Sequence, residues 1–367
     1  MAAKRVVFHV GTMKSGTSFV QSVLNSQAGD LREAGVEAVG GGGRPKGRYR
    51  ALPHRAAEAL LGPDRDRTRW NEVVDLARDS SCETVVVSSE FFSFLRPDGI
   101  AELVESFADV ELAVVLSVRD QFGAIPAQWQ SFTRNRGRSS FASYTAIIRE
   151  GSARRSRALR TFRRAQDVAT ILERWDRPGV DDLAVVTVPP SGSSPDQLWQ
   201  RFTEACRMPA TEPELEDAKD NQSLGYAACD YLRRLNAQLT DLGRHPYHQL
   251  VRPVARDLLA PLSGGQERPR LDRATAELAV SLNEVIRTEI ESRRVRLVGA
   301  LSDLPVAADL DGFPDDVAPP SAGQVRESAE VVHAHAAVQA GTPGARPPSD
   351  LASLVAETAR LLRSAPE

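Results

Sequence analysis

Residues 5–24 of the chain run RVVFHVGTMKSGTSFVQSVL. The segment 5–10 is short and rich in β-branched residues, which predicts a buried strand, and a glycine loop follows it at 11–16. Apolar side chains then recur on one helical face over 17–24, which predicts a helix. Strand, glycine loop and helix in this order form a cradle for phosphate, because glycine lets the backbone approach an anion closely and the amides at the helix start point toward it.

Further along the chain, short apolar runs alternate with helical patterns. The runs are β-branched without polar alternation, as expected of strands covered on both faces, and they lie at 84–88, 112–118 and 183–188. Predicted helices lie between and after them, at 70–79, 158–174, 196–206, 224–242 and 271–292. The alternation predicts an α/β fold with a parallel β-sheet flanked by helices, followed by a helical C-terminal part.

Composition divides the chain into three parts. Residues 1–304 form the predicted α/β domain, which is strand-rich over 1–190 and helical over 191–304. Residues 305–350 are rich in proline, small residues and acids, which predicts a disordered linker. Residues 351–367 have the pattern of a short C-terminal helix.

Charge and cysteine content exclude several classes of protein. The chain has 367 residues, and its 46 basic and 49 acidic side chains give a net charge of −3, unlike a nucleic-acid coat protein or a wholly disordered chain. No stretch approaches the roughly 20 apolar residues of a membrane span, and no apolar segment of a secretory signal follows Met1. Cys82, Cys206 and Cys229 lack the spacing of metal ligands, so we expect reduced thiols in the cytoplasm.

The glycine loop differs from the Walker A loop of kinases and NTPases in one position. Gly11 and Gly16 have the spacing of the pattern G-x-x-x-x-G-K-[ST], but Thr17 stands where that pattern has its lysine. Lys14, one of only four lysines beside 42 arginines, lies inside the loop instead. A small-molecule kinase or NTPase stays an alternative, because Glu90 or Asp120 could supply the acid that such enzymes have at a strand end.

The loop resembles that of a known family. Residues 9–18, HVGTMKSGTS, are similar to the 5′-phosphosulfate loop of sulfotransferases that use 3′-phosphoadenosine 5′-phosphosulfate (PAPS), which has the pattern K-[ST]-G-T-[ST]. The similarity is closest to bacterial members of the actinobacterial type and covers about residues 5–304. It includes further short segments at 88–92, 118–120, 126–130, 186–190 and 221–224.

The resemblance implies that PAPS is the co-substrate and that the acceptor is a hydroxyl of a small molecule or glycan. The residues that would hold the 5′-phosphosulfate share the family pattern, and they are Met13, Lys14, Ser15, Gly16, Thr17 and Ser18. Lys14 would stabilise the bridging oxygen, Glu90 would remove the acceptor proton, and Arg119 would hold the 3′-phosphate. The reaction that the resemblance implies requires no metal ion.

One departure from the family pattern concerns the 3′-phosphate. The family has a serine eight residues after the arginine, and that position is Ala127 here. Ser131 is a candidate replacement, as are Gln128, Gln130 and Arg134. The departure keeps a further alternative open, in which the chain retains a sulfotransferase fold for binding without catalysis.

Several of these residues also have a purely structural interpretation. Arg119 could belong to a surface ion pair, and Glu90 could complement the dipole of a helix start. We expect His9 to be a packing residue at the end of a strand. His54 is either a surface residue or part of an acceptor pocket.

Two segments are strongly basic. Ten arginines and a single acid, Glu150, lie between 134 and 164, which is typical either of a rim that attracts an anionic donor or of a solvated helical face. Few aromatic residues accompany these charges, so we do not expect nucleic acid as a partner. The glycine-rich and basic stretch 40–50 predicts a mobile loop.

Overall fold

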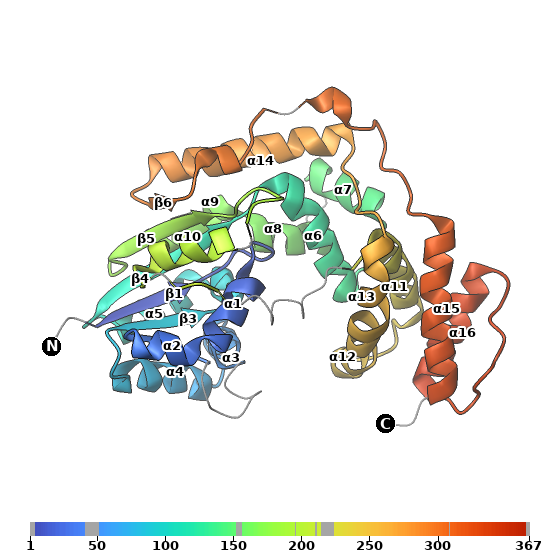
Figure 1. The fold of residues 1–367 in the computed structure, drawn as a ribbon, viewed down its shortest axis with the longest axis horizontal. Helices are drawn as coiled ribbons and strands as arrows, with labels where there is room; N and C mark the ends of the chain where they lie inside the picture. The colour runs from blue at the N-terminus through green and yellow to red at the C-terminus, as the bar shows by residue number, and fades with distance from the viewer. Residues whose placement is uncertain are drawn as a thin grey trace. The chain divides into compact units, whose positions relative to one another are not determined.

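The computed structural model describes residues 4–40, 51–151, 156–194, 196–209, 211–213, 224–307 and 309–364. The chain divides into two compact units (Figure 1). The α/β unit comprises residues 1–124, 162–220 and 279–308, and the helical unit comprises 125–161, 221–278 and 309–367. Most of the predicted mobile loop, residues 41–50, lies outside the described residues.

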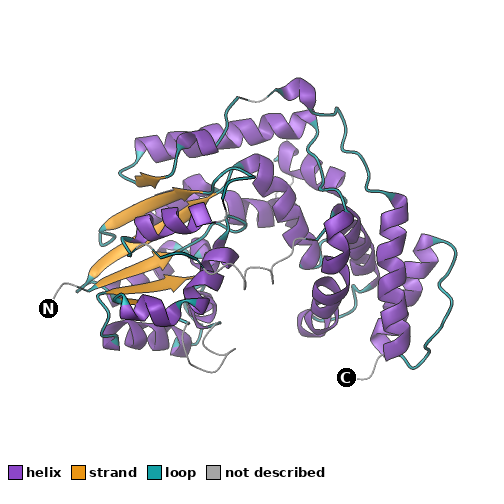
Figure 2. Cartoon of the chain, viewed as in Figure 1, coloured by secondary structure: helices purple, strands orange, loops and turns teal. Residues whose placement is uncertain are grey.

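The α/β unit is built on a six-stranded parallel sheet, which confirms the predicted fold class (Figure 2). In spatial order the strands are β2 (Val36–Ala38), β3 (Thr84–Ser88), β1 (Arg5–His9), β4 (Glu111–Val118), β5 (Asp182–Thr187) and β6 (Arg296–Val298). The predicted strands lie within one residue of β1, β3, β4 and β5. The sequence does not predict β2 and β6, because three residues are too few to form a recognisable apolar run.

Helices cover both faces of the sheet. On one face lie α1 (Thr17–Ser26), α2 (Ala28–Glu33) and α10 (Asp196–Cys206). On the other lie α3 (Leu52–Ala59), α4 (Thr68–Asp79), α5 (Pro97–Ser106), α9 (Val168–Trp175) and the C-terminal part of α14 (Arg273–Ser292). Val7 of β1 packs into the first core, whereas Val6 and Phe8 pack into the second. Burial on both faces explains why the strands show no polar alternation.

The predicted helix 158–174 is two helices, α8 (Arg157–Gln166) and α9. Asp167 stands between them, and its carboxylate accepts a hydrogen bond from the amide of Thr170 at 3.1 Å. This side chain caps the start of α9, so the chain begins a new helix there instead of continuing the first. Two short 3-10 helices complete the α/β unit, η1 (Glu90–Phe94) and η5 (Leu301–Asp303).

The helical unit holds the remaining helices. They are the C-terminal part of α6 (Gln121–Arg134), α7 (Phe141–Glu150), α11 (Tyr226–Gln238), α12 (Arg244–Pro253), the π-helical η3 (Val254–Leu259), α13 (Ala260–Leu262), η4 (Ser263–Gly265), η6 (Leu310–Gly312), α15 (Ala322–Gln339) and α16 (Leu351–Ser364). In its core the rings of Trp129, Phe141 and Tyr226 lie 5.2, 5.6 and 6.1 Å apart. This unit therefore has a hydrophobic core of its own.

The prediction of a disordered linker over 305–350 is wrong for its middle part, which forms α15. The prolines of the segment flank this helix instead of interrupting it, and the Ser321 hydroxyl caps its start by accepting from the amide of Gln324 at 3.4 Å. Val325, Ala329 and Val332 recur at helical spacing and are buried. The count of prolines and small residues over the whole segment therefore concealed a helix that packs against α11 and α16.

The division of the chain also differs from the predicted single domain over 1–304. Residues 125–161 and 224–278 group with the C-terminal segment 309–364, which contains α15 and α16. The sequence pattern placed them with the sheet because helices that follow strands are the usual cover of a parallel sheet. In this chain, those helices cover one another instead.

The cysteines and the apolar character of the helices can be compared with the sequence-based expectations. Cys82, Cys206 and Cys229 are all buried, and none of them forms a disulfide. Burial raises the pKa of the Cys206 thiol well above its ordinary range, which makes that sulfur unreactive. None of the helices in the described residues combines the length and the apolar character needed to cross a membrane.

Candidate functional site

The glycine loop leaves β1 at the carboxyl edge of the sheet and enters α1. The amide of Val10 donates to Val115 O at 2.9 Å and the amide of Thr12 donates to Ser117 O at 2.7 Å, so the loop begins by extending the pairing with β4. The Ser15 hydroxyl then donates to Thr12 O at 2.7 Å and closes the turn. The chain continues from β1 toward β2 and β3 but from β4 toward β5 and β6, so the loop lies at the switch point where parallel sheets bind ligands.

Three loop residues, Gly11, Lys14 and Gly16, have positive φ angles. Gly16 has a φ of 80°, and a Cβ at this position would also overlap Leu198 Cδ2. Lys14 has a φ of 66°, which costs a residue other than glycine about 1–2 kcal/mol. Backbone strain of this kind is concentrated at functional sites, because a folded chain retains it only where the surrounding structure imposes it. Lys14 is therefore held in an unfavourable conformation inside the loop.

Glu90 follows β3 and lies directly against the loop. A Cβ on Gly11, which has a φ of 108°, would stand 3.2 Å from both Cα and Cβ of Glu90. Gln21 of α1 donates from Nε2 to Glu90 Oε2 at 3.1 Å, and the Ser89 hydroxyl caps η1 by accepting from the amide of Phe91 at 3.3 Å. The Glu90 carboxylate is thus oriented by the helix that the loop begins.

Arg119 follows β4, on the other side of β1. A Cβ on Gly123 would lie 2.6 Å from Arg119 Nε and 2.9 Å from Cζ, so the guanidinium rests on this glycine in the first turn of α6. Asp120 caps the same helix by accepting from the amide of Gly123 at 2.9 Å. Ser117, which pairs with the loop at Thr12, lies two residues before Arg119. Arg119 and the loop therefore leave neighbouring strands at the same edge, and Asp120 has a structural role.

Buried glutamines support the loop from behind, and no sequence pattern predicts them. Gln166 donates from Nε2 to Met13 O at 2.7 Å, and Gln121 donates to Gln166 Oε1 at 3.4 Å. The amide of Gln121 in turn donates to Asn283 Oδ1 at 3.0 Å. This chain of hydrogen bonds links the loop to α8, α6 and α14. Gln21 was likewise not predicted, although its place four residues after Thr17 puts both on one face of α1.

His9 is a packing residue, as expected for a histidine at a strand end. It is 0% exposed, and its Nδ1 and Nε2 lie 2.8 Å from Ser88 Oγ and 3.0 Å from Ser117 Oγ. Burial lowers the pKa of His9 to about 3, so the ring is neutral at physiological pH. His9 therefore joins β1 to β3 and β4 beneath the loop and takes no charge there.

His54 lies beside the helix that carries Glu90. Its ring on α3 contacts Phe91 edge to face with centroids 3.6 Å apart, and Phe91 in turn contacts Phe94 at 5.3 Å. His54 is half-buried. Of its two interpretations, this placement favours a position at the border of the site over an isolated surface position.

The predicted 3′-phosphate residues are divided between the units. Ser131 and Ala127 lie on the part of α6 in the helical unit, whereas Lys14, Glu90 and Arg119 belong to the α/β unit. Gln130, another candidate, donates to the main-chain oxygen of Leu224 at 3.0 Å. A contact between Ser131 and the 3′-phosphate stays a prediction.

The basic stretch 134–164 is also divided, after Thr161. In the helical unit, Arg149 binds both carboxylate oxygens of Asp272 at 2.6 and 2.7 Å, so this arginine is structural. Arg154 and Arg155 lie outside the described residues. The stretch is therefore not uniformly solvated.

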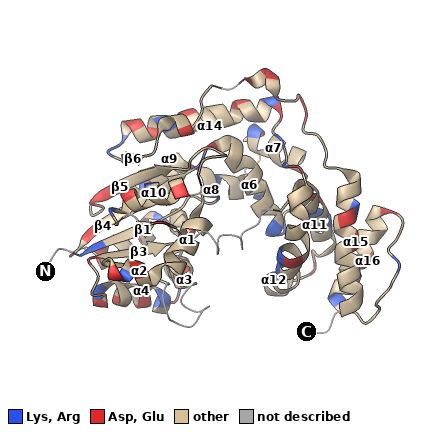
Figure 3. Ribbon diagram, viewed as in Figure 1, with Lys and Arg blue, Asp and Glu red and all other residues tan. Residues whose placement is uncertain are grey.

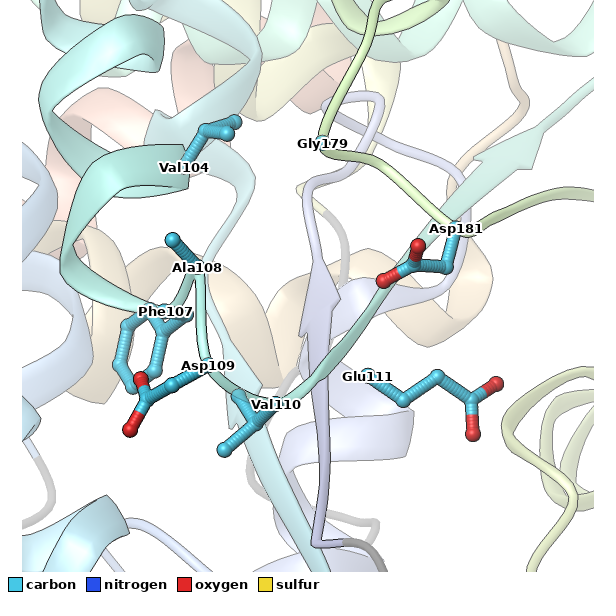
Figure 4. A pocket seen from close by; sticks show the side chains of 8 residues that line it. All are labelled: Val104, Phe107, Ala108, Asp109, Val110, Glu111, Gly179 and Asp181. Atoms are coloured by element: carbon cyan, nitrogen blue, oxygen red, sulfur yellow. The ribbon is translucent and has the colours of Figure 1, made fainter.

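A cavity of about 560 Å³ lies in the α/β unit far from the loop, at the amino ends of β4 and β5 (Figure 4). Its lining consists of Val104, Phe107, Ala108, Asp109, Val110, Glu111, Gly179 and Asp181. The acids are engaged: Asp181 accepts from the amide of Leu112 at 2.8 Å, Asp109 pairs with Arg78 at 3.1 Å, and Glu111 pairs with Arg5. These contacts stabilise the edge of the sheet at the amino ends of the strands, which is opposite to the edge that carries the loop.

The site thus consists of residues from three adjacent strand ends: the loop after β1, Glu90 after β3 and Arg119 after β4. This arrangement suits an anion on the loop, a proton acceptor on one side and a second anion on the other. Within the described residues, no group of three or more histidine, cysteine or acidic side chains could hold a metal ion. Comparisons of the chain with models of protein families, with characterised proteins and with solved structures find no match.

Proposed function

We propose that the chain is a PAPS-dependent sulfotransferase that transfers a sulfuryl group to a hydroxyl of a small molecule or glycan. The observation that carries the proposal is the contact between the lysine-bearing loop and Glu90. Gly11 packs on the backbone of Glu90, so an anion on the loop and a base for the acceptor would meet at the end of β1. Transfer of a sulfuryl group to a hydroxyl requires these two elements side by side.

The donor would bind through its two charged ends. The amides at the start of α1, that of Ser15 included, lie at the positive end of the helix dipole and would hold the 5′-phosphosulfate, assisted by the hydroxyls of Thr17 and Ser18. The Ser15 hydroxyl donates to Thr12 O and so shapes the loop. Arg119 would bind the 3′-phosphate, because a guanidinium presents paired N–H donors that match two phosphate oxygens.

The reaction balances with the groups at the site. The acceptor oxygen attacks sulfur, its proton passes to the Glu90 carboxylate, and the bond between sulfur and the bridging oxygen breaks. The products are a sulfate ester and 3′,5′-ADP. Negative charge develops on the bridging oxygen, where the compact ammonium of Lys14 would stabilise it. Gln21, 3.1 Å from Glu90 Oε2, would orient the base.

The proposal places the reaction in the cytoplasm and assigns the neutralising charge to Lys14. Three buried thiols that form no disulfide support a reducing compartment, where cysteines persist without disulfides. In kinases, a divalent cation neutralises the transferred group. In the scheme proposed here, an amine of the protein has that role.

Ligand binding distinguishes the sulfotransferase from a kinase or NTPase. We expect isothermal titration to show micromolar binding of 3′,5′-ADP and at least about tenfold weaker binding of ATP with Mg²⁺. The reason is that Thr17, 3% exposed, stands in place of the Walker lysine. Micromolar binding of ATP without binding of 3′,5′-ADP would overturn the proposal. Binding of 3′,5′-ADP without turnover of PAPS over a broad panel of hydroxyl acceptors would favour the non-catalytic alternative.

The contact between Gly11 and Glu90 gives a second prediction. Gly11→Ala is expected to abolish most turnover, because the added Cβ would stand only 3.2 Å from Cα and Cβ of Glu90 and would displace that residue. The variant should also lower the free energy of unfolding by about 1–3 kcal/mol, because alanine is strained at this positive φ. Urea unfolding and turnover of the same preparation measure the two effects. Gly35→Ala is the matched control, since Gly35 has a φ of 83° and a Cβ added there would meet no atom within 4 Å. It should lose stability but keep its turnover; wild-type turnover in Gly11→Ala would contradict the proposed role of this contact.

A further inference from the structure

Three arginines gather at the end of η1 that is remote from Glu90. Arg164 of α8 lies over the ring of Phe94, with its Cζ 4.3 Å from the ring centroid. Arg96 follows Phe94 by two residues, and Arg65 comes from the segment between α3 and α4. Burial, and then the positive charges of Arg96 and Arg65, lower the pKa of Arg164, so Arg96 and Arg65 both lie within electrostatic reach of Arg164.

Among the described residues, none of these three arginines forms an ion pair with an acid. Arg65, Arg96 and Arg164 have no carboxylate at ion-pair distance in that part of the chain, whereas neighbouring arginines such as Arg67 and Arg78 are paired with acids. Elsewhere the two signs are interspersed, as Figure 3 shows along α14 and α15. Three like charges held together repel one another, and a bound anion would relieve that repulsion.

An apolar surface connects these arginines to Glu90. Glu90 and Phe94 are the first and last residues of η1, so the 3-10 rise separates them by about 8 Å along the helix axis. The rings of His54, Phe91 and Phe94 contact one another in sequence, at 3.6 and 5.3 Å. The apolar part of a molecule could pack against these rings with one end at the carboxylate and the other at the arginines.

We propose that the acceptor is a hydroxylated anion, whose carboxylate, sulfate or phosphate group binds Arg65, Arg96 and Arg164 while its hydroxyl faces Glu90. The inference rests on the proposed sulfuryl transfer and names the class of its acceptor. Guanidinium groups suit this role because their planar N–H pairs match the oxygens of such anions. The backbone rise of about 8 Å between Glu90 and Phe94 suits an acceptor of about the length of one ring with its substituents.

Matched pairs of acceptors test this inference. The pairs are 4-hydroxyphenylacetate with 4-methylphenol, and glucuronate with glucose, which differ in the anionic group. With PAPS as donor, the anionic member of at least one pair should have a kcat/KM at least about tenfold higher. The double variant Arg96→Ala/Arg164→Ala should lower this preference about tenfold, mainly through KM. The control Arg78→Ala removes an exposed arginine at the other end of the sheet and should leave the preference unchanged.

The outcomes separate this inference from the proposed function. If the chain binds 3′,5′-ADP and turns over neutral and anionic members equally, or if the double variant lowers both members equally, the acceptor inference is wrong and the sulfotransferase proposal stands. Titration of 4-hydroxyphenylacetate and glucuronate without donor measures the arginine site by itself. Suppose that the chain binds these anions, that the double variant does not, and that neither binds 3′,5′-ADP. The anion site would then stand, and the sulfotransferase proposal would be overturned.

Discussion

Replacing Glu90 with glutamine is expected to lower kcat by about 10²–10⁴-fold, the usual contribution of a general base. Glutamine has the same shape and can still accept a hydrogen bond from Gln21, which lies 3.1 Å from the carboxylate. The change therefore removes the proton acceptor while the loop, packed on the backbone of residue 90, stays in place. Single-turnover measurement of sulfate transfer gives the chemical step directly.

Two controls make the Glu90→Gln result specific. Its affinity for 3′,5′-ADP should change by no more than about twofold, because the carboxylate acts on the acceptor and not on the donor. Glu83→Gln removes an exposed acid just before β3, at the opposite end of that strand, and should have wild-type kcat. Retained turnover in Glu90→Gln would show that another group takes the proton, and Glu90 would then be a structural acid at the start of η1.

Replacing Lys14 with alanine is expected to lower kcat by about 10²–10³-fold, as for removal of one preorganised charge from a developing oxyanion. The affinity for PAPS should also fall, because the ammonium lies in the loop that would hold the phosphosulfate. Lys14→Arg should recover only part of the rate, since a planar guanidinium matches a single leaving oxygen less well than a compact ammonium. Pre-steady-state measurement of sulfuryl transfer from labelled PAPS compares the rates of the wild type, Lys14→Ala and Lys14→Arg.

The backbone of Lys14 provides a matched control for its charge. Lys14→Gly also removes the ammonium, but glycine adopts a φ of 66° without strain, so this variant should be at least as stable as Lys14→Ala and equally inactive. Lys4→Ala tests the other described lysine, whose Nζ donates to the main-chain oxygens of Ala77, Arg78 and Ser80 at 2.9, 2.8 and 2.6 Å. It should lose stability and keep its kcat. Recovery of activity in Lys14→Gly would mean that loop geometry, and not charge, limits the reaction.

The central strands could be predicted from the sequence because burial on both faces makes each one a continuous apolar run. Residues 84–88 and 112–118 agree with β3 and β4 to within one residue for this reason. The order of the strands could not be predicted, since the local pattern says nothing about which strands pair. The division into two units likewise depends on which helices pack together, and α15 was hidden in a segment whose average composition suggests disorder.

Three of the predicted site residues lie at one edge of the sheet because the strands that precede them are neighbours. The sequence places Lys14, Glu90 and Arg119 each just after a strand, and the order β3-β1-β4 brings those three ends together. The supporting residues Gln21 and Gln166 could not be predicted in the same way. A glutamine has no periodic or compositional signal, and its role arises only from the hydrogen bonds that the folded chain provides.

The uncharged His9 beneath the loop determines how the protein should respond to acid. Its pKa is about 3 in the folded chain, whereas an unfolded histidine has its ordinary pKa of about 6.5. Between these values, the unfolded chain binds a proton at His9 that the folded chain does not. The free energy of unfolding is therefore highest above about pH 6.5, as far as His9 is concerned, and falls as the pH decreases toward 3. Because His9 connects β1 to Ser88 and Ser117, acid acts on the platform that supports the loop. Loss of the scaffold would then contribute to the acid limit of the activity.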